Sequence, residues 1–226
     1  MIKVKSLSKT FGKKEVLKGI NLAFGKGEIH GIVGKNGSGK TTLFRSIIGL
    51  EKSEGSIESL FEHPLKNITG FLPTSPPIIS KITTVEYLQL ICNARGITFD
   101  RNGFENIFEL PLDQYIETFS TGMTKKLALH GALLQKNEVF ILDEPYNGLD
   151  YQSCLLVTEI LKRIKEKGKT VIISSHIFST LRDTCDYIHY LENGTINSTA
   201  DRDHFDQIEK QLQQELIGDK IDHLIF

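Results

Sequence analysis

The chain has 226 residues, of which 39% are hydrophobic and 24% are charged, and its formal net charge is −1 at pH 7. This length and composition are those of a globular domain with a sizeable core, so disordered and fibrous proteins are excluded. A nucleic-acid binder carries a basic excess that this chain lacks, and we therefore expect no nucleic-acid partner.

Strand and helix signals alternate along most of the chain. Residues 1–33 alternate between apolar and polar in the manner of strands, with turn signals at 11–14 and 25–27. Short apolar runs that end in glycine or polar residues are typical of buried parallel strands. The runs are Ile29–Val33, Val139–Leu142 and 171–173, and helical patterns follow them near 39–49, 150–167 and 177–184. This order predicts an α/β fold with an N-terminal antiparallel β part and a mostly parallel core sheet, whose functional residues lie at the carboxyl ends of the strands.

The middle of the chain has mainly helical signals. The sequence TTVE at residues 83–86 fits a capping box that begins a helix through Arg95. Two further helical patterns lie near 100–110 and 121–135. These signals indicate a group of helices inserted between two parts of the sheet.

We expect one domain over residues 1–226, because no repeat, linker or low-complexity tract divides the chain. Its expected parts are a sheet core (1–73 and 136–200), a helical subdomain (74–135), and a C-terminal helix with an apolar tail (201–226). The tail is expected to pack on the domain, with contact to a partner as the alternative.

Cysteine usage and hydropathy bear on the compartment. The three cysteines are widely spaced and odd in number, and they offer neither a disulfide framework nor a zinc spacing. A reducing cytosol is the simplest compartment for such a chain. The N-terminus lacks an apolar signal core, and no run approaches the roughly 18 apolar residues that span a bilayer. We therefore expect a cytoplasmic protein.

A glycine-rich loop lies between the first predicted buried strand and the helix after it. The sequence GKNGSGKT at residues 34–41 lets the backbone turn several N–H groups toward one phosphate chain. The lysine of such a loop reaches the β- and γ-phosphates, and the hydroxyl that follows it can bind Mg²⁺. The candidate ATP-binding residues of this loop are Gly34, Asn36, Gly37, Ser38, Gly39, Lys40, Thr41 and Thr42.

The stretch FSTGMTKK, residues 119–126, indicates a second anion site. A serine, a threonine and a glycine precede an apolar-periodic run, as at the start of a helix. A helix start presents free backbone N–H groups and the positive end of the helix dipole. The chain therefore has two predicted anion sites, and the second needs an explanation.

Two adjacent carboxylates follow the run Val139–Leu142. Asp143, at the end of a buried strand, is placed to hold Mg²⁺ directly or through water. Glu144 is interpreted as the general base that orients and polarises the attacking water. His176, at the end of a further strand, is expected to contact the γ-phosphate, whereas the remaining histidines show no ligand spacing and are interpreted as structural.

These motifs together resemble those of the ATP-binding cassette (ABC) ATPases, the nucleotide-binding subunits of ABC transporters. The similarity extends over residues 1 to about 200. The matches are Phe11 to the aromatic residue that stacks on adenine, 34–42 to Walker A, FSTGM to the signature that usually reads LSGGQ, 139–144 to Walker B, NGLD at 147–150 to the D-loop with Asp150, and His176 to the switch histidine.

The resemblance explains the second anion site. In this family two cassettes pack head to tail, and the signature of one covers the γ-phosphate bound by the other. The resemblance thus implies that Ser120, Thr121 and Gly122 act on the partner's nucleotide. Thr121 and Met123 replace the usual glycine and glutamine, but Ser120 and Gly122 remain, so we expect a working signature.

One residue departs from the family's pattern. Where the sheet leads into the helical subdomain the family usually has a glutamine, which helps to ligate Mg²⁺, and this chain has Thr74 in the sequence GFLPTSPP. Threonine has a shorter reach and no amide. We therefore expect Thr74 to contact Mg²⁺ through water or not at all, with Lys40, Thr41 and Asp143 sufficient for binding.

The resemblance implies an ATPase, with ATP and Mg²⁺ as cofactors, that dimerises with a second copy or a paralogous cassette subunit. It further implies separately encoded membrane permease subunits, with this chain peripheral on the cytoplasmic face of the membrane. The sequence STGM at 120–123, and the sequence FLP at 71–73 that leads into the helical subdomain, resemble those of the ATPase subunits of export-type bacterial systems. The alternative is an ABC-type ATPase that serves assembly or regulation without a permease.

Overall fold

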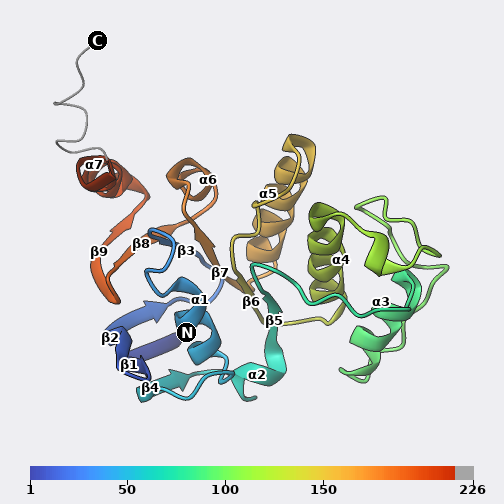
Figure 1. The fold of residues 1–226 in the computed structure, drawn as a ribbon, viewed down its shortest axis with the longest axis horizontal. Coiled ribbons are helices and arrows are strands. Elements are labelled where there is room, and N and C mark those ends of the chain that lie inside the picture. The colour runs from blue at the N-terminus through green and yellow to red at the C-terminus, as the bar shows by residue number, and fades with distance from the viewer. Residues whose placement is uncertain (217–226) are drawn as a thin grey trace, which may run out of the picture.

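The computed structural model describes residues 1–216, in which the strands form two sheets (Figure 1). The strands are β1 (Ile2–Phe11), β2 (Lys14–Phe24), β3 (Ile29–Val33), β4 (Glu54–Ser59), β5 (Thr69–Leu72), β6 (Val139–Leu142), β7 (Thr170–Ser175), β8 (Tyr187–Glu192) and β9 (Thr195–Asp201). An antiparallel sheet has the order β2-β1-β4, and a larger sheet has the order β5-β6-β7-β3-β8-β9. In the larger sheet only the β8–β9 pair is antiparallel. The predicted α/β class is confirmed.

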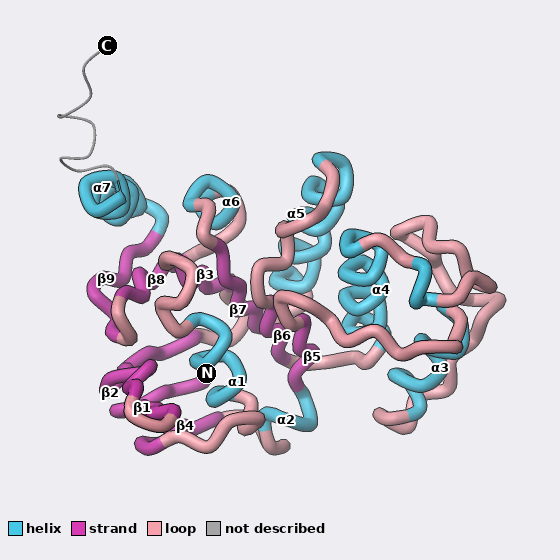
Figure 2. Tube along the Cα trace, viewed as in Figure 1, coloured by secondary structure: helices cyan, strands magenta, loops and turns pink. Residues whose placement is uncertain are grey.

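Helices cover the larger sheet and extend to one side of it, as the colours of Figure 2 show. They are α1 (Lys40–Ile47), α2 (Leu65–Ile68), α3 (Thr84–Asn93), α4 (Thr121–Leu134), α5 (Tyr151–Glu166), α6 (Phe178–Arg182) and α7 (Phe205–Leu216), with 3-10 turns η1 (Ile116–Thr118) and η2 (Arg202–His204). Figure 1 shows α4 on the opposite side of β5 and β6 from α1. The two helices therefore lie on different sides of these strands.

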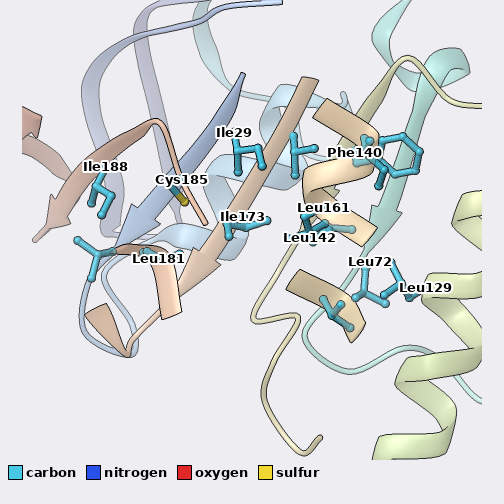
Figure 3. Packing of buried hydrophobic residues seen from close by; sticks show 14 of the residues in the cluster. Ile29, Leu72, Leu129, Phe140, Leu142, Leu161, Ile173, Leu181, Cys185 and Ile188 are labelled. Atoms are coloured by element: carbon cyan, nitrogen blue, oxygen red, sulfur yellow. The ribbon is translucent and has the colours of Figure 1, made fainter. Parts of the chain in front are cut away.

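The core has two parts because successive side chains of a strand point to opposite faces of the sheet. Val139 and Ile141 of β6 pack with α1 and the antiparallel sheet. Phe140 and Leu142 of the same strand pack on the other face with α4 and α5, where Figure 3 shows Leu161 of α5 beside Leu142. Burial on both faces explains why β6 reads as a continuous apolar run.

The helices begin where the sequence predicts them. Thr83 Oγ1 accepts from the N–H of Glu86, and Glu86 Oε2 accepts from the N–H of Thr83 at 2.7 Å, so the capping box before α3 is confirmed. Ser120 and Asp150 are the N-caps of α4 and α5. The C-terminal helix is present as α7, and the predicted apolar tail over 217–226 lies outside the described residues.

The helix predicted near residues 100–110 is wrong. This segment is a loop, because its polar side chains bond the local backbone in non-helical geometry. Asn106 receives the N–H of Leu110 at 3.0 Å and donates to the carbonyl of Leu110 at 2.7 Å. Phe104 and Phe108 pack against the ring of His130 in α4. The apolar spacing therefore anchors a loop to α4. The limits given above for the sheet core and the helical subdomain stay predictions.

Candidate functional site

The candidate site lies at one edge of the larger sheet. The strands β5, β6, β7 and β3 are parallel neighbours, so their carboxyl ends share that edge. The glycine-rich loop follows β3, Thr74 follows β5, Asp143 and Glu144 follow β6, and His176 follows β7. Residues from four distant parts of the sequence thus meet at one place.

The glycine-rich loop needs glycine at specific positions. A Cβ on Gly34 would lie 2.3 Å from the carbonyl oxygen of Leu191, a contact that no backbone tolerates. Gly39 has φ 112°, a conformation that side-chain-bearing residues rarely adopt. The loop then leads directly into α1 at Lys40, where backbone N–H groups at a helix start can receive an anion.

Lys40 is buried under this loop. Its Nζ donates to the carbonyl of Gly34 at 2.7 Å and lies 3.4 Å from Glu144 Oε1. The second distance is that of an ion pair, but its geometry is not that of a hydrogen bond, and Glu144 Oε1 has no hydrogen-bond partner. The ammonium group therefore lies between the glycine-rich loop and the predicted base.

Three hydroxyl groups surround the carboxylate of Asp143, which is 1% exposed. Thr41 Oγ1 and Thr74 Oγ1 donate to Oδ2 at 2.5 and 2.6 Å, and Ser174 Oγ donates to Oδ1 at 2.6 Å. Within residues 1–216, no group of three or more His, Cys, Asp or Glu side chains could hold a metal ion. One carboxylate with hydroxyl oxygens nonetheless fits Mg²⁺, which takes few protein ligands when substrate phosphates supply the others.

Glu144 has a constrained backbone. Its φ is 53°, in the left-handed region, and such a conformation persists only where the surroundings fix it. Its N–H donates to Ser174 Oγ at 2.9 Å. Its Oε2 lies 2.9 Å from Nδ1 of His176. An ionised Glu144 accepts a hydrogen bond there from an Nδ1 that carries a proton. The structure therefore joins the predicted base to the predicted switch histidine.

An open pocket of about 420 Å³ lies over these residues. It brings together most of the predicted binding residues, and Gly34, Ser38 and His176 lie outside its lining. Phe11, 46% exposed, lines the pocket beside the ammonium group of Lys9, which is 4.5 Å from its ring centroid. The predicted residues in the lining are Phe11, Asn36, Gly37, Gly39, Lys40, Thr41, Thr42, Thr74, Asp143 and Glu144.

The predicted signature does not line this pocket. Ser120 caps α4, its Oγ accepting the N–H of Met123 at 3.2 Å, and Thr121 and Gly122 form the first turn. A Cβ on Gly122 would lie 2.7 Å from the carbonyl of Gly148, so α4 approaches the segment 147–150 closely. Within one chain, the predicted second anion site therefore lies outside the pocket that the glycine-rich loop lines.

Asp150 joins that segment to α4 and α5. Its carboxylate accepts the N–H of Ser153 at 2.8 Å and lies 3.1 Å from Nζ of Lys126. The backbone N–H and hydroxyl of Ser153, with Lys126, hold the pKa of Asp150 below its usual range. Asp150 is thus bound as an ionised cap.

Sequence reasoning missed two residues at this site. Ser174 donates to Asp143 and accepts from Glu144, but a serine within a strand carries no sequence signal for such a bridge. Lys125 is 1% exposed, and its ammonium group bonds the carbonyls of Glu144 and Asn147. Its helical spacing from the buried Leu129 was the available signal.

The buried histidines His30 and His189 lie away from this edge, within β3 and β8. Their rings stack with centroids 5.4 Å apart. Burial lowers the pKa of His30 to about 4, against a raising effect of Asp186, and lowers that of His189 to about 3. Both are neutral at physiological pH and serve packing, as expected of these histidines.

Comparisons with known proteins agree with this geometry. The sequence pattern of the family described as "ABC transporter" matches residues 17–147. The chain is 29% identical to the lantibiotic transport ATP-binding protein SrtF of Streptococcus pyogenes, over 97% of this chain and 99% of that protein. It is 30% identical to the bacitracin transport ATP-binding protein BcrA of Enterococcus faecalis, over 86% and 67%.

Solved structures share the fold. The structure of an ATP-binding subunit of an ABC transporter superposes with a TM-score of 0.76 at 27% identity, over 94% of this chain and 93% of that chain. A dimeric ATP-binding cassette bound to ADP and Pi has the same TM-score at 24% identity, over 89% and 99%, and shows the fold alone.

Proposed function

This chain belongs to the ABC transporter family and is an ATPase of that family, and on this premise we propose that it powers transport through separate membrane subunits as half of an ATP-dependent dimer. In the described part of the chain, no helix is long and apolar enough to cross a bilayer. A permease would then supply the membrane path, and the chain would work at the cytoplasmic face.

The pocket at the sheet edge is the proposed ATP site. Phe11, half-exposed at its rim, offers a face on which adenine stacks. The loop over 34–42 would receive the phosphates through its backbone N–H groups, with Lys40 turning from the Gly34 carbonyl to the β- and γ-phosphates. Thr41 and Asp143 would hold Mg²⁺, which neutralises charge on the phosphates when bound.

Glu144 is the proposed general base. Its carboxylate is almost fully buried, and one oxygen, Oε1, accepts no hydrogen bond and lies 3.4 Å from Lys40 Nζ. Movement of Lys40 toward the phosphates would free this oxygen to orient a water. His176 holds the other oxygen at 2.9 Å. This contact fixes the direction of the carboxylate and places Nε2 on the opposite side of the ring. Donation from Nε2 to a phosphate oxygen would require that nitrogen to carry a proton as well as Nδ1.

The observation that carries the dimer is the separation of the two anion sites. The N-terminus of α4 presents N–H groups and the positive end of a dipole, yet Ser120, Thr121 and Gly122 do not line the chain's own pocket. A nucleotide on a second cassette, identical or paralogous, is the ligand that such a separate site fits. Donors fixed in this way stabilise charge that develops in the transition state.

Export is the proposed direction of transport. It is supported by relatives whose names concern lantibiotic and bacitracin transport. Expression of a tagged chain, followed by purification from detergent-solubilised membranes, tests the function. A polytopic membrane protein should co-purify, and ATP hydrolysis should be retained. Recovery of an active ATPase with no membrane protein would support the second reading, an ABC-type ATPase that acts in assembly or regulation.

A further inference from the structure

Lys125 is a buried lysine in α4 whose partners are backbone carbonyls. Its Nζ donates to the carbonyl oxygens of Glu144 and Asn147, each at 2.8 Å. Burial lowers the pKa of the ammonium group, while the charges of Glu144 and Asp143 raise it. An ammonium group in the interior is costly unless it is well bonded, so an apolar side chain would serve packing at this position more cheaply.

The two carbonyls belong to the turn that carries the proposed base. The N–H of Asn147 donates to the carbonyl of Glu144 at 3.1 Å and closes this turn. Glu144 itself has φ 53°. Ser174 receives its N–H, and Lys125 donates to its carbonyl. The strained residue is therefore held from both sides of its own backbone, by β7 on one side and by α4 on the other.

The same helix carries the residues proposed to act on the partner's nucleotide. Gly122 lies against Gly148, and Lys126 pairs with Asp150 at 3.1 Å, so three successive contacts connect α4 to residues 144–150. Of these, the contact of Lys125 reaches Glu144 directly. It therefore bonds the helix of one anion site to the base of the other.

We propose that Lys125 is a positioning residue that holds the backbone of Glu144 in the conformation from which its carboxylate orients the attacking water. The inference rests on the proposed function of Glu144 as the base. Lys125 itself does not line the proposed ATP pocket, so it is not placed to contact the nucleotide. Its removal should therefore reduce turnover and spare ATP binding.

Lys125→Met tests the proposal, because methionine keeps the unbranched shape and removes the donors. We expect kcat to fall by about tenfold or more, since small misplacements of a reacting group have large kinetic effects. The ATP affinity of the monomer should stay within about threefold of wild type, because Lys125 does not line the pocket and its loss should affect the chemical step alone. In a Glu144→Gln background, Lys125→Met should cause no further loss, since the carboxylate that it positions is already absent.

Ile208→Ala, at a buried position of α7, is the control for lost stability. It should lower the melting temperature and leave kcat per folded molecule unchanged. Lys125→Ala, which also removes the donors, provides a second variant if methionine prevents folding.

The proposal is overturned if kcat of the Lys125 variants stays within about threefold of wild type. It is also overturned if their kcat falls only in step with the melting temperature, as in the control, or if their loss adds fully to that of Glu144→Gln. Retention of wild-type turnover in Glu144→Gln alone would instead refute the base, which separates the two failures.

Discussion

Replacement of Thr74 by valine tests whether its hydroxyl serves the protein or the metal. Valine has a similar shape and removes the donor that lies 2.6 Å from Asp143 Oδ2. Thr41 and Ser174 still donate to this buried carboxylate. A hydrogen bond to a charged group contributes about 1.5–3 kcal/mol, and the remaining donors reduce that loss, so we expect the free energy of unfolding to fall by about 1–2 kcal/mol. The melting temperature of metal-free protein should fall by about 2–8 °C.

Turnover should respond less than it would to the loss of a metal ligand. We expect basal kcat of Thr74→Val to fall by less than tenfold, or about 1.4 kcal/mol of barrier, because Thr41 and Asp143 remain for Mg²⁺. Thr74→Ser keeps the hydroxyl and should match wild type in both thermal melts and Mg²⁺-titrated ATPase assays. If valine abolished hydrolysis while serine preserved it, Thr74 would be a direct ligand of the metal, and our reasoning would be wrong.

Three other predictions concern the nucleotide. Glu144→Gln should lower hydrolysis by about 10²–10⁴-fold and accumulate ATP-dependent dimers in size-exclusion runs, and near wild-type turnover would remove Glu144 from the mechanism. Ser120→Arg should abolish hydrolysis with little change in ATP affinity of the monomer by calorimetry, whereas Lys40→Ala should weaken that affinity; equal losses would contradict two separate sites. Phe11→Ala should weaken ATP binding by up to about tenfold, in line with the 0.5–1.5 kcal/mol of an aromatic stacking contact. The affinity for inorganic triphosphate, which has no adenine, should be unchanged.

The sequence predicted the parts of the site whose chemistry is local. The loop over 34–41 carries its glycines, lysine and hydroxyl within one turn, and Asp143 follows directly on a strand that is apolar throughout. Parallel strands then place these ends at one edge, which composition and order suffice to predict. The capping box at Thr83 is of the same kind, because both of its partners lie within one helical turn.

The parts that were missed depend on contacts between distant residues. Ser174 is 31 residues from Asp143, and Lys125 is 19 residues from Glu144, and nothing in their immediate sequence specifies the partner. The loop near 100–110 shows the opposite problem. Its apolar residues have helical spacing, but the side chain of Asn106 bonds the backbone of Leu110 and competes with a helix there.

The position of Thr74 shows how a residue shorter than the family's usual glutamine can still connect the segment after β5 to Asp143. It follows β5, which is the direct neighbour of β6, so hydrogen-bond reach to Asp143 is enough. The segment that leads from the sheet toward α3 is thereby bonded to the same carboxylate as Thr41 of the phosphate-binding loop. Pro76 and Pro77 follow and stiffen that segment, because proline fixes φ. If the segment carries movement of the helices to a permease, Thr74→Val should impair permease-stimulated hydrolysis more than basal hydrolysis, and equal impairment of both would show that the hydroxyl serves only the nucleotide site.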